Sequence, residues 1–299
     1  MLLIRPIIFF AGKGGVGKTT MAAAHALAAA DAGHRTLVVS TDPAHSLGDA
    51  FEISLGDRPR RIADGLWAAE PDAAAAVRRR VRQVEDDAAA ALPRAIMPAV
   101  RQHLGHASAG PGMTESALTD LLTGYLAEVP DRWDRLIVDS APTGHLLRMI
   151  ALPSLLAPWI HGLVRRRERV VAADRFAEAV LGGVGPEEDP LLERLHQRRR
   201  RLEEAAGRLR DDAEVRLVLV PRRMVLAETE RAADALAEGG FTLGRVVLNQ
   251  VGPDADPTLL AGITRRFARP GVACYATAPA EPTGFGRLRE LAASGRDDR

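Results

Sequence analysis

The sequence predicts an α/β fold in which helices cover a doubly wound, mainly parallel sheet. Short apolar runs alternate with longer, helix-forming stretches along the 299 residues, an order that is typical of parallel sheets joined by helical crossovers. Several of the apolar runs also end in polar residues. In open α/β sheets, ligands bind beyond the carboxyl ends of the strands. The two patterns together predict both the fold class and the edge of the sheet that carries the site.

Each element follows from local sequence. Apolar runs predict strands at residues 7–11, 36–40, 66–70, 136–140, 215–220, 246–248 and 272–276. Helices are expected at 19–30, 114–128 and 225–238, and residues 294–299 are expected to form a frayed tail. Two charged, Ala-rich segments add a helical subdomain at about 72–132 and 151–210, the second broken at 182–186. We therefore expect one domain, residues 1–299, with this subdomain formed by insertions.

A glycine-rich loop links the first predicted strand to the first predicted helix. Its pattern is G-x-x-x-x-G-K-T, which binds phosphate when it lies between a strand and a helix. Backbone N–H groups turn inward around phosphate oxygens, and the positive end of the helix adds to the attraction. Lys18 is expected to reach the β and γ phosphates and Thr19 to ligate Mg²⁺. The expected nucleotide-binding residues are Gly12, Lys13, Gly14, Gly15, Val16, Gly17, Lys18, Thr19 and Thr20.

Lysine usage supports this interpretation. The chain contains only two lysines, Lys13 and Lys18, and all its other basic residues are arginine. A compact ammonium group suits a phosphate site better than a planar guanidinium does. A chance match in a Gly- and Ala-rich protein is the alternative, and context, spacing and lysine usage all count against it.

Two aspartates follow predicted strands. Asp42 comes after the strand at 36–40, and Asp139 closes the strand at 136–140. By itself, Asp42 reads as a turn residue before Pro43 and Asp139 as a cap for the next helix. With a phosphate loop upstream, Asp139 fits the acidic residue that reaches Mg²⁺ or its water. We therefore expect Thr19, Asp42 and Asp139 to form a magnesium site.

Composition limits the other functional classes. A net charge of +1 and an aromatic content of 4% give no sign of a nucleic-acid surface. Cys274 is the sole cysteine, so a CxxC pair or an intramolecular disulfide is not expected. The first residues lack a signal-peptide pattern, and we expect no apolar stretch long enough to span a bilayer. A cytoplasmic location follows, with peripheral contact to a membrane left open.

One apolar stripe has two interpretations. Its side chains recur at helical spacing and are Leu152, Leu155, Leu156, Trp159, Ile160, Leu163 and Val164. Core packing is the ordinary explanation, and part of a hydrophobic client groove is the other. The sequence does not decide between them.

Four motifs in order resemble one family. They are G-K-G-G-V-G-K-T-T at Gly12, S-T-D-P-A-H-S-L at Ser40, D-S-A-P-T-G-H-L-L-R at Asp139 and L-A-E-T-E-R at Leu226. With Asn249-Gln250 they are similar to the arsenical pump-driving ATPase (ArsA) family, which includes the ATPase that targets tail-anchored membrane proteins. The resemblance implies a phosphate-loop NTPase fold of the deviant Walker A class, with ATP/ADP and Mg²⁺ as cofactors.

The resemblance also implies roles for single residues. Lys13 would reach the nucleotide of a partner subunit, Asp42 would orient the attacking water, and Asp139 would sense Mg²⁺ and the γ-phosphate. With Lys18, the first two form the expected catalytic set. Asn249 matches the adenine-recognising position. Arg222 stands where the family has a glutamate, so its expected nucleotide contact is unusual.

The implied protein is a nucleotide-gated ATPase dimer, formed with a second copy or a paralogue, that couples hydrolysis to a client or a membrane partner. Without further cysteines, zinc and arsenite sites are not expected. Two alternatives remain. One is a positioning ATPase like the partitioning and division-site proteins, and the other is a non-catalytic nucleotide-dependent subunit beside an active paralogue.

Overall fold

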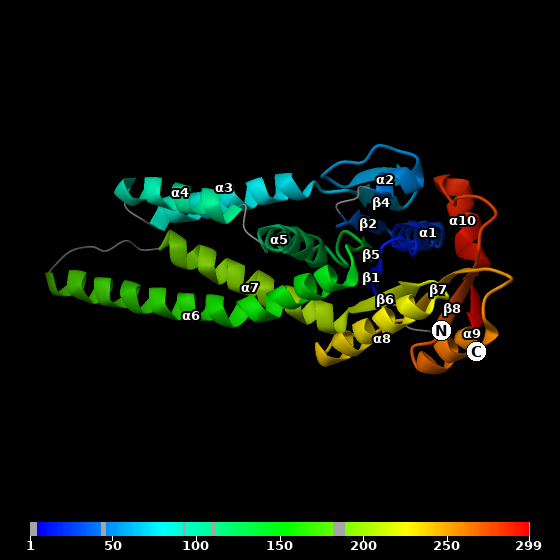
Figure 1. Cartoon of the computed structure of the whole chain (residues 1–299). Coiled ribbons are helices and arrows are strands. Elements are labelled where there is room, and N and C mark those ends of the chain that lie inside the picture. Colours follow the sequence, from blue (N-terminus) through cyan, green and yellow to red (C-terminus); the bar gives the residue numbers. More distant parts are fainter. Residues whose placement is uncertain (1–4, 43–45, 92–93, 109–111, 182–188, 299) are drawn as a thin grey trace. The chain divides into compact units, whose positions relative to one another are not determined.

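The computed structural model describes residues 5–42, 46–91, 94–108, 112–181 and 189–298 (Figure 1). The chain divides into two compact units. The sheet unit comprises Met1–Ala73, Glu128–Arg148 and Arg208–Arg299, and the helical unit comprises Ala74–Ala127 and Met149–Gly207. Three long helices begin in one unit and end in the other, so the chain passes between the units inside helices.

The sheet unit is built on nine strands among the described residues, in the order β3-β4-β2-β5-β1-β6-β7-β8-β9. Its central strands are β1 (Ile7–Gly12), β2 (Thr36–Ser40), β5 (Arg135–Asp139), β6 (Ala213–Leu219) and β7 (Val246–Val251). The outer strands are β4 (Leu66–Ala69), β8 (Val272–Ala276), and at the edges β3 (Arg60–Ala63) and β9 (Arg296–Asp298). All neighbours pair in parallel except the edge pairs β3–β4 and β8–β9. The predicted α/β class with a mainly parallel sheet is confirmed.

Helices of this unit pack on the sheet. They are α1 (Lys18–Asp31), α2 (Ser46–Phe51), α8 (Arg223–Glu238), α9 (Pro257–Arg266) and α10 (Gly284–Ser294). Helix α1 lies against β1, β2 and β5 and also contacts α2 and α10, and α8 packs on β6. The alanines of α1 explain this close packing: Ala22, Ala23, Ala24 and Ala26 are fully buried. Small side chains let the helix axis approach the strands, and the phosphate loop sits at its amino end.

The helical unit contains α4 (Met97–Ser108), the short 3₁₀ helix Arg94–Ile96 and α5 (Met113–Ala127). It also contains most of α3 (Ala73–Ala91), α6 (Thr143–Leu181) and α7 (Pro190–Asp211). Ile160 and Val164 of α6 pack against Leu202 of α7 in a small buried cluster. The break expected at 182–186 lies outside the described residues. The apolar stripe of residues 152–164 therefore supplies core at Ile160 and Val164.

Two expectations about the chain are wrong, and one strand was not predicted. The tail is not frayed throughout, because Arg296, Asp297 and Asp298 pair with β8 as β9. The edge strand β3 has no strong apolar signal, since it reads Arg-Arg-Ile-Ala with two exposed arginines. Finally, residues Thr143–Ala173 of α6 are long and apolar enough to cross a membrane, by length and composition. An 18-residue window of this segment has a mean hydropathy of 1.4, and 28% of that window is buried.

Candidate functional site

The site residues come together because of strand order. Strands β2, β5, β1, β6 and β7 are consecutive neighbours, and they run in parallel, so their carboxyl ends open at one edge. Cα pairing sets Ser40 of β2 beside Asp139 of β5, and Asp139 beside Phe10 of β1. The residues after each strand end therefore lie along the same edge of the sheet, although up to about 240 positions separate them in sequence.

Two glycines of the phosphate loop are required by their surroundings. A Cβ on Gly12 would lie 2.3 Å from the Val218 carbonyl oxygen, which no side chain tolerates. Gly17 has φ +93°, a left-handed conformation, and a Cβ there would lie 2.4 Å from Asn249 Nδ2. By contrast, a Cβ on Gly14 or Gly15 would meet no atom within 4 Å. The loop is thus packed tightly at its ends and open in its middle, where a phosphate group would approach.

Lys18 opens α1 from a buried position. Its side chain is only 6% exposed, and its Nζ lies 3.7 Å from Asp42 Oδ2. The first turn of α1 contains no acidic residue, so the helix amino end and the ammonium group provide positive charge that Asp42 neutralises only in part. An anionic ligand with several negative charges fits this environment.

Asp139 is the acidic centre of the site. Its side chain is fully buried, and its Oδ2 accepts hydrogen bonds from Thr19 Oγ1 at 2.9 Å and Ser40 Oγ at 2.8 Å. Its Oδ1 is buried without a hydrogen-bond partner. Burial raises the pKa of Asp139 to about 6, against the opposing effect of the Ser40 and Thr19 hydrogen bonds. An unsatisfied carboxylate oxygen is costly in a protein interior, and a cation would remove that cost.

These donors fit Mg²⁺. The Thr19 hydroxyl, the Asp139 carboxylate and, nearby, Asp42 are hard oxygen groups, which Mg²⁺ prefers. Among the described residues no group of three or more His, Cys, Asp or Glu side chains is arranged to hold a metal ion. Mg²⁺ at phosphate sites is bound through one or two protein groups, and waters and phosphate oxygens are its other ligands. A small donor set such as Thr19 and Asp139 fits this way of binding.

Lys13 contacts helix α8. Its Nζ lies 3.2 Å from Glu228 Oε2 of α8, and the two side chains are 43% and 40% exposed. Lys13 is therefore reachable from solvent, unlike Lys18, and it has an anionic partner in its own chain.

The two remaining predicted ligand residues differ in placement. Asn249 is buried in β7, and its Nδ2 donates to the Val16 carbonyl oxygen at 2.9 Å, so it lies directly against the phosphate loop. Arg222 precedes α8 with an extended backbone. Its side chain is exposed and makes no hydrogen bond or ion pair with the rest of the described chain. The structure brings Asn249 to the loop and gives no such contact for Arg222.

Three residues at the site were not singled out from the sequence. Ser40 and Ser46 both lie in the S-T-D-P-A-H-S-L motif; Ser40 bonds Asp139, and Ser46 Oγ lies 2.9 Å from Thr19 Oγ1. Their hydroxyls flank Asp42 in sequence, which is a signal that could have identified them. Glu228 lies in the L-A-E-T-E-R motif, but its contact with Lys13 spans 215 positions and has no local signal.

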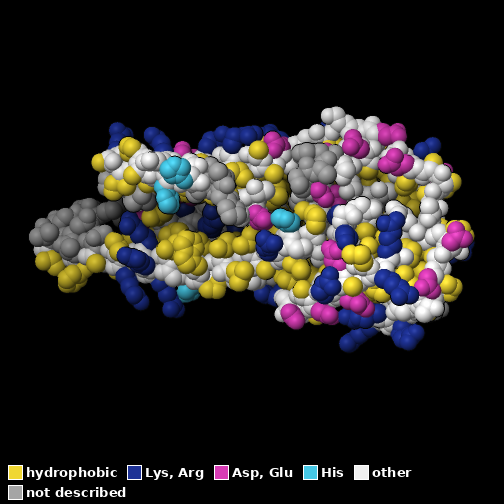
Figure 2. All heavy atoms as spheres, viewed as in Figure 1, with side chains coloured by type: hydrophobic (Ala, Val, Ile, Leu, Met, Phe, Trp, Pro, Cys, Tyr) yellow, Lys and Arg dark blue, Asp and Glu magenta, His cyan; other side chains and the backbone are white. Residues whose placement is uncertain are grey.

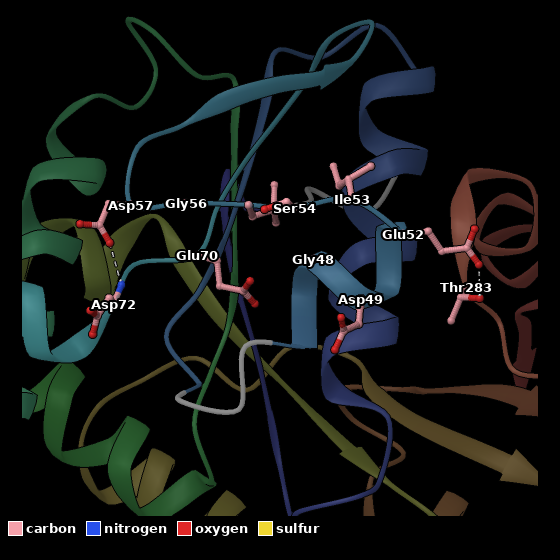
Figure 3. Close-up of a pocket in the computed structure, with 11 residues that line it drawn as sticks. Gly48, Asp49, Glu52, Ile53, Ser54, Gly56, Asp57, Glu70, Asp72 and Thr283 are labelled. Carbon is pink, nitrogen blue, oxygen red and sulfur yellow. Dashed lines mark hydrogen bonds between the residues drawn. The ribbon is translucent and has the colours of Figure 1, made fainter.

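A separate acidic pocket lies beside α2 (Figure 3). Its volume is about 860 Å³, and five carboxylates line it: Asp49, Glu52, Asp57, Glu70 and Asp72. Three of them accept hydrogen bonds from the chain itself, as Glu70 from the Leu47 N–H, Asp57 from the Asp72 N–H and Glu52 from the Thr283 hydroxyl. Its negative charge excludes a polyphosphate, so this pocket is not the nucleotide site.

The chain is similar to known ATPases. The sequence profile of the family described as Anion-transporting ATPase (ArsA ATPase) matches residues 5–263. An arsenical pump-driving ATPase from Acidiphilium multivorum is 34% identical over 259 residues, covering 85% of this chain and 40% of that protein. Another from Escherichia coli is 34% identical over 272 residues, covering 88% and 43%.

A plant relative is similar as well. ATPase GET3B from Arabidopsis thaliana is 31% identical over 268 residues, covering 83% of this chain and 65% of that protein. The chain spans about two fifths of the length of the two pump-driving ATPases. Because the family profile matches residues 5–263, most of its length, this chain belongs to the anion-transporting ATPase (ArsA) family.

Proposed function

We propose that this protein binds ATP with Mg²⁺ and hydrolyses it to ADP and phosphate. One observation carries the proposal: Thr19 and Ser40 both donate to one oxygen of the fully buried Asp139, while the other oxygen has no partner. A carboxylate so placed beside a phosphate loop is prepared for a cation. When bound, Mg²⁺ would be held by Thr19 and Asp139 and would neutralise charge on the β and γ phosphates.

The phosphate loop, Lys18 and Asn249 bind the nucleotide. The backbone N–H groups of the open loop centre, Gly14 and Gly15, and the Lys18 ammonium bind the triphosphate. Asn249, fixed against Val16, provides a side-chain amide at the position expected for the adenine. Because phosphoryl transfer depends mainly on positioning and on charge neutralisation, these residues account for substrate binding and for part of the rate enhancement.

Asp42 orients the attacking water. It follows β2, lies 3.7 Å from Lys18 Nζ and is 15% exposed, so it is close to the phosphate-binding ammonium and open to solvent on one side. A carboxylate there accepts a hydrogen bond from water and turns its oxygen towards the γ-phosphate. Its partial exposure supports this role better than that of a buried structural residue.

We further propose that two copies, or one copy and a paralogue, enclose the nucleotides. Lys13 supports this, because it is a phosphate-loop lysine that faces solvent and Glu228 rather than its own phosphate site. In a dimer its ammonium would add positive charge to the partner's γ-phosphate. ATP binding would then favour the closed pair, and hydrolysis would release it.

The relatives' names suggest a transport or targeting role, so we propose that the nucleotide state controls a client or a membrane partner. The lone Cys274 gives no support for a metalloid site of the thiolate type.

The test compares three purified proteins: the natural chain, Lys18→Ala and Asp42→Asn. The natural chain should release phosphate from Mg-ATP at a steady rate. Lys18→Ala should lose nucleotide binding, measured with a fluorescent ATP analogue, and Asp42→Asn should bind it normally. No steady phosphate release by the natural chain, alone or with client candidates, would contradict the proposed hydrolysis. A mass that stays monomeric with the non-hydrolysed analogue would contradict the self-paired form.

A further inference from the structure

Helix α6 is apolar on two sides within the helical unit. Its inner side contains Ile160 and Val164, which are 4% and 1% exposed and pack against Leu202. The inner side is therefore already satisfied by α7. Large apolar side chains on the opposite side of the helix as well are expected where a second apolar surface covers them.

The other side does carry such residues. Leu155, Trp159, Val170, Phe176 and Val180 are 68%, 62%, 41%, 74% and 69% exposed. At about 100° per residue they fall within an arc of about 120°, opposite Ile160 and Val164. Figure 2 shows hydrophobic side chains along α6, interrupted by basic ones. Of the seven large hydrophobic residues that are exposed in the described chain, five lie on this face.

Positive charge accompanies this face. Arg166 and Arg169 fall inside the same arc and Arg165 at its border, and all three are exposed. None of the three forms an ion pair with a described residue, whereas their neighbour Arg167 pairs with Asp189 at 2.7 Å. Glu168, the acidic residue that neighbours these arginines, falls outside the arc.

We propose that this face of α6, defined by Leu155, Trp159, Arg165, Arg166, Arg169, Val170, Phe176 and Val180, binds the surface of a membrane that contains anionic phospholipid. Large apolar side chains, Trp among them, accompanied by arginines are features of helices that lie in the membrane interface. Anionic headgroups attract the arginines while the apolar side chains enter the acyl boundary.

Other occupants fit less well. A purely apolar partner helix would bury Arg166 and Arg169 without a counter-charge, which is costly. Nucleic acid would satisfy the arginines but leave Leu155, Phe176 and Val180 in water. A transmembrane orientation would require the inner side to leave α7 and would place the arginines in hydrocarbon. A helix lying on the surface keeps both the α7 contact and the charge pairing.

The test uses the full-length protein without nucleotide and two kinds of vesicle, phosphatidylcholine alone and phosphatidylcholine with phosphatidylglycerol. We expect the apparent affinity to be at least about tenfold higher for the anionic vesicles. Trp159 provides a direct signal, since it is exposed while Trp67 is half-buried and Trp133 is buried: its emission should shift to the blue, and brominated acyl chains should quench it.

Matched variants distinguish vesicle binding by this face from nonspecific binding. Trp159→Ser with Phe176→Ser, and separately Arg166→Gln with Arg169→Gln, should each weaken anionic-vesicle binding about tenfold or more. Met224→Ser, at a residue 79% exposed on α8, and Arg265→Gln on α9 should leave it unchanged. Circular dichroism and the melting temperature check that every variant is folded.

Lys18→Ala should bind vesicles like the natural chain, so a failed ATPase test and a failed membrane test are distinguishable. Equal affinity for neutral and anionic vesicles would overturn the proposal. So would loss of binding in the Met224 and Arg265 controls, or preference for single-stranded DNA over anionic vesicles. A concentration-dependent dimer that Trp159→Ser with Phe176→Ser abolishes, without any vesicle binding by the natural chain, would assign the face to a second copy instead.

Discussion

Lys13 Nζ lies 3.2 Å from Glu228 Oε2, which ties the phosphate loop to helix α8 within one chain. Both side chains are about two fifths exposed, so water screens the pair and it contributes at most about 1 kcal/mol. If Lys13 serves a partner's nucleotide, it must leave Glu228 first. Glu228 then acts as a weak competitor of the γ-phosphate for the same ammonium group.

Glu228→Gln should therefore strengthen nucleotide-dependent pairing. Without the competing carboxylate, the dimer dissociation constant with a non-hydrolysed ATP analogue should fall by up to about fivefold, the equivalent of about 1 kcal/mol. Sedimentation at several protein concentrations measures it. Glu230→Gln is the matched control, because Glu230 lies on the same helix and pairs with Arg266 instead. A dimer weakened by Glu228→Gln would assign Glu228 to the interface itself.

Asp42→Asn should separate binding from turnover. The amide keeps the size of the side chain but cannot accept hydrogen bonds with both of its terminal atoms, so the water is no longer oriented. We expect ATP affinity within about threefold of the natural value and kcat lower by about 10²-fold or more. Phosphate release at saturating ATP gives kcat, and a binding titration gives the affinity. Unchanged kcat would remove Asp42 from the catalytic set.

Asp139 should make magnesium binding dependent on pH. Its pKa is raised to about 6 by burial, so the carboxyl is mostly protonated at pH 5 and ionised at pH 8. A cation must displace the proton at the lower pH. We expect Mg²⁺ with ADP to raise the melting temperature, relative to ADP alone, more at pH 8 than at pH 5. Asp139→Asn should abolish that difference, and a difference that persists in this variant would place the cation elsewhere.

His25 should make the protein acid-labile. Its ring packs beside Phe10 and Tyr275, and its Nδ1 lies 2.8 Å from the Met21 carbonyl oxygen. Burial and then Arg216 lower the pKa of His25 from 6.5 to about 4. Above pH 6.5 both folded and unfolded states hold a neutral ring. Between pH 6.5 and 4 only the unfolded state gains the proton. The free energy of unfolding therefore decreases as the pH is lowered through this range, by up to about 3 kcal/mol.

The measurement is urea unfolding at intervals from pH 7.5 to 4. His25→Gln keeps a side-chain donor for Met21 but does not titrate, so its stability should depend less steeply on pH in this window. His161 of α6, which is half-buried, is replaced in the same way as the control and should leave the slope as it was. Equal slopes for His25→Gln and the natural chain would contradict the lowered pKa.

The sequence predicted the sheet and the position of its site for a physical reason. Buried parallel strands need continuous apolar runs, so 36–40 and 272–276 were readable residue by residue, and polar residues that interrupt such runs mark the strand ends. Asp139 was found in this way. Its unpaired Oδ1 and its raised pKa were not, because the first depends on which hydroxyls the fold brings within 3 Å of the carboxylate and the second on how deeply the fold buries it.

Other features could not be predicted from the sequence, for related reasons. The Lys13–Glu228 contact depends on where α8 lies against the loop, which no local pattern encodes. Strands β3 and β9 are short and charged, so they lack an apolar signal and form only by pairing with β4 and β8. On α6, helical spacing predicted an apolar stripe but not that Leu155 and Trp159 face water while Ile160 and Val164 face α7.

The two outermost strands of the sheet also restrict how the protein can assemble. Both run antiparallel to their neighbours, and both are short and rich in charge, with Arg60 and Arg61 at one border and Arg296, Asp297 and Asp298 at the other. Such borders resist the addition of a further strand from another molecule. A continuous intermolecular sheet is thereby disfavoured, which works against fibre-like association of the protein.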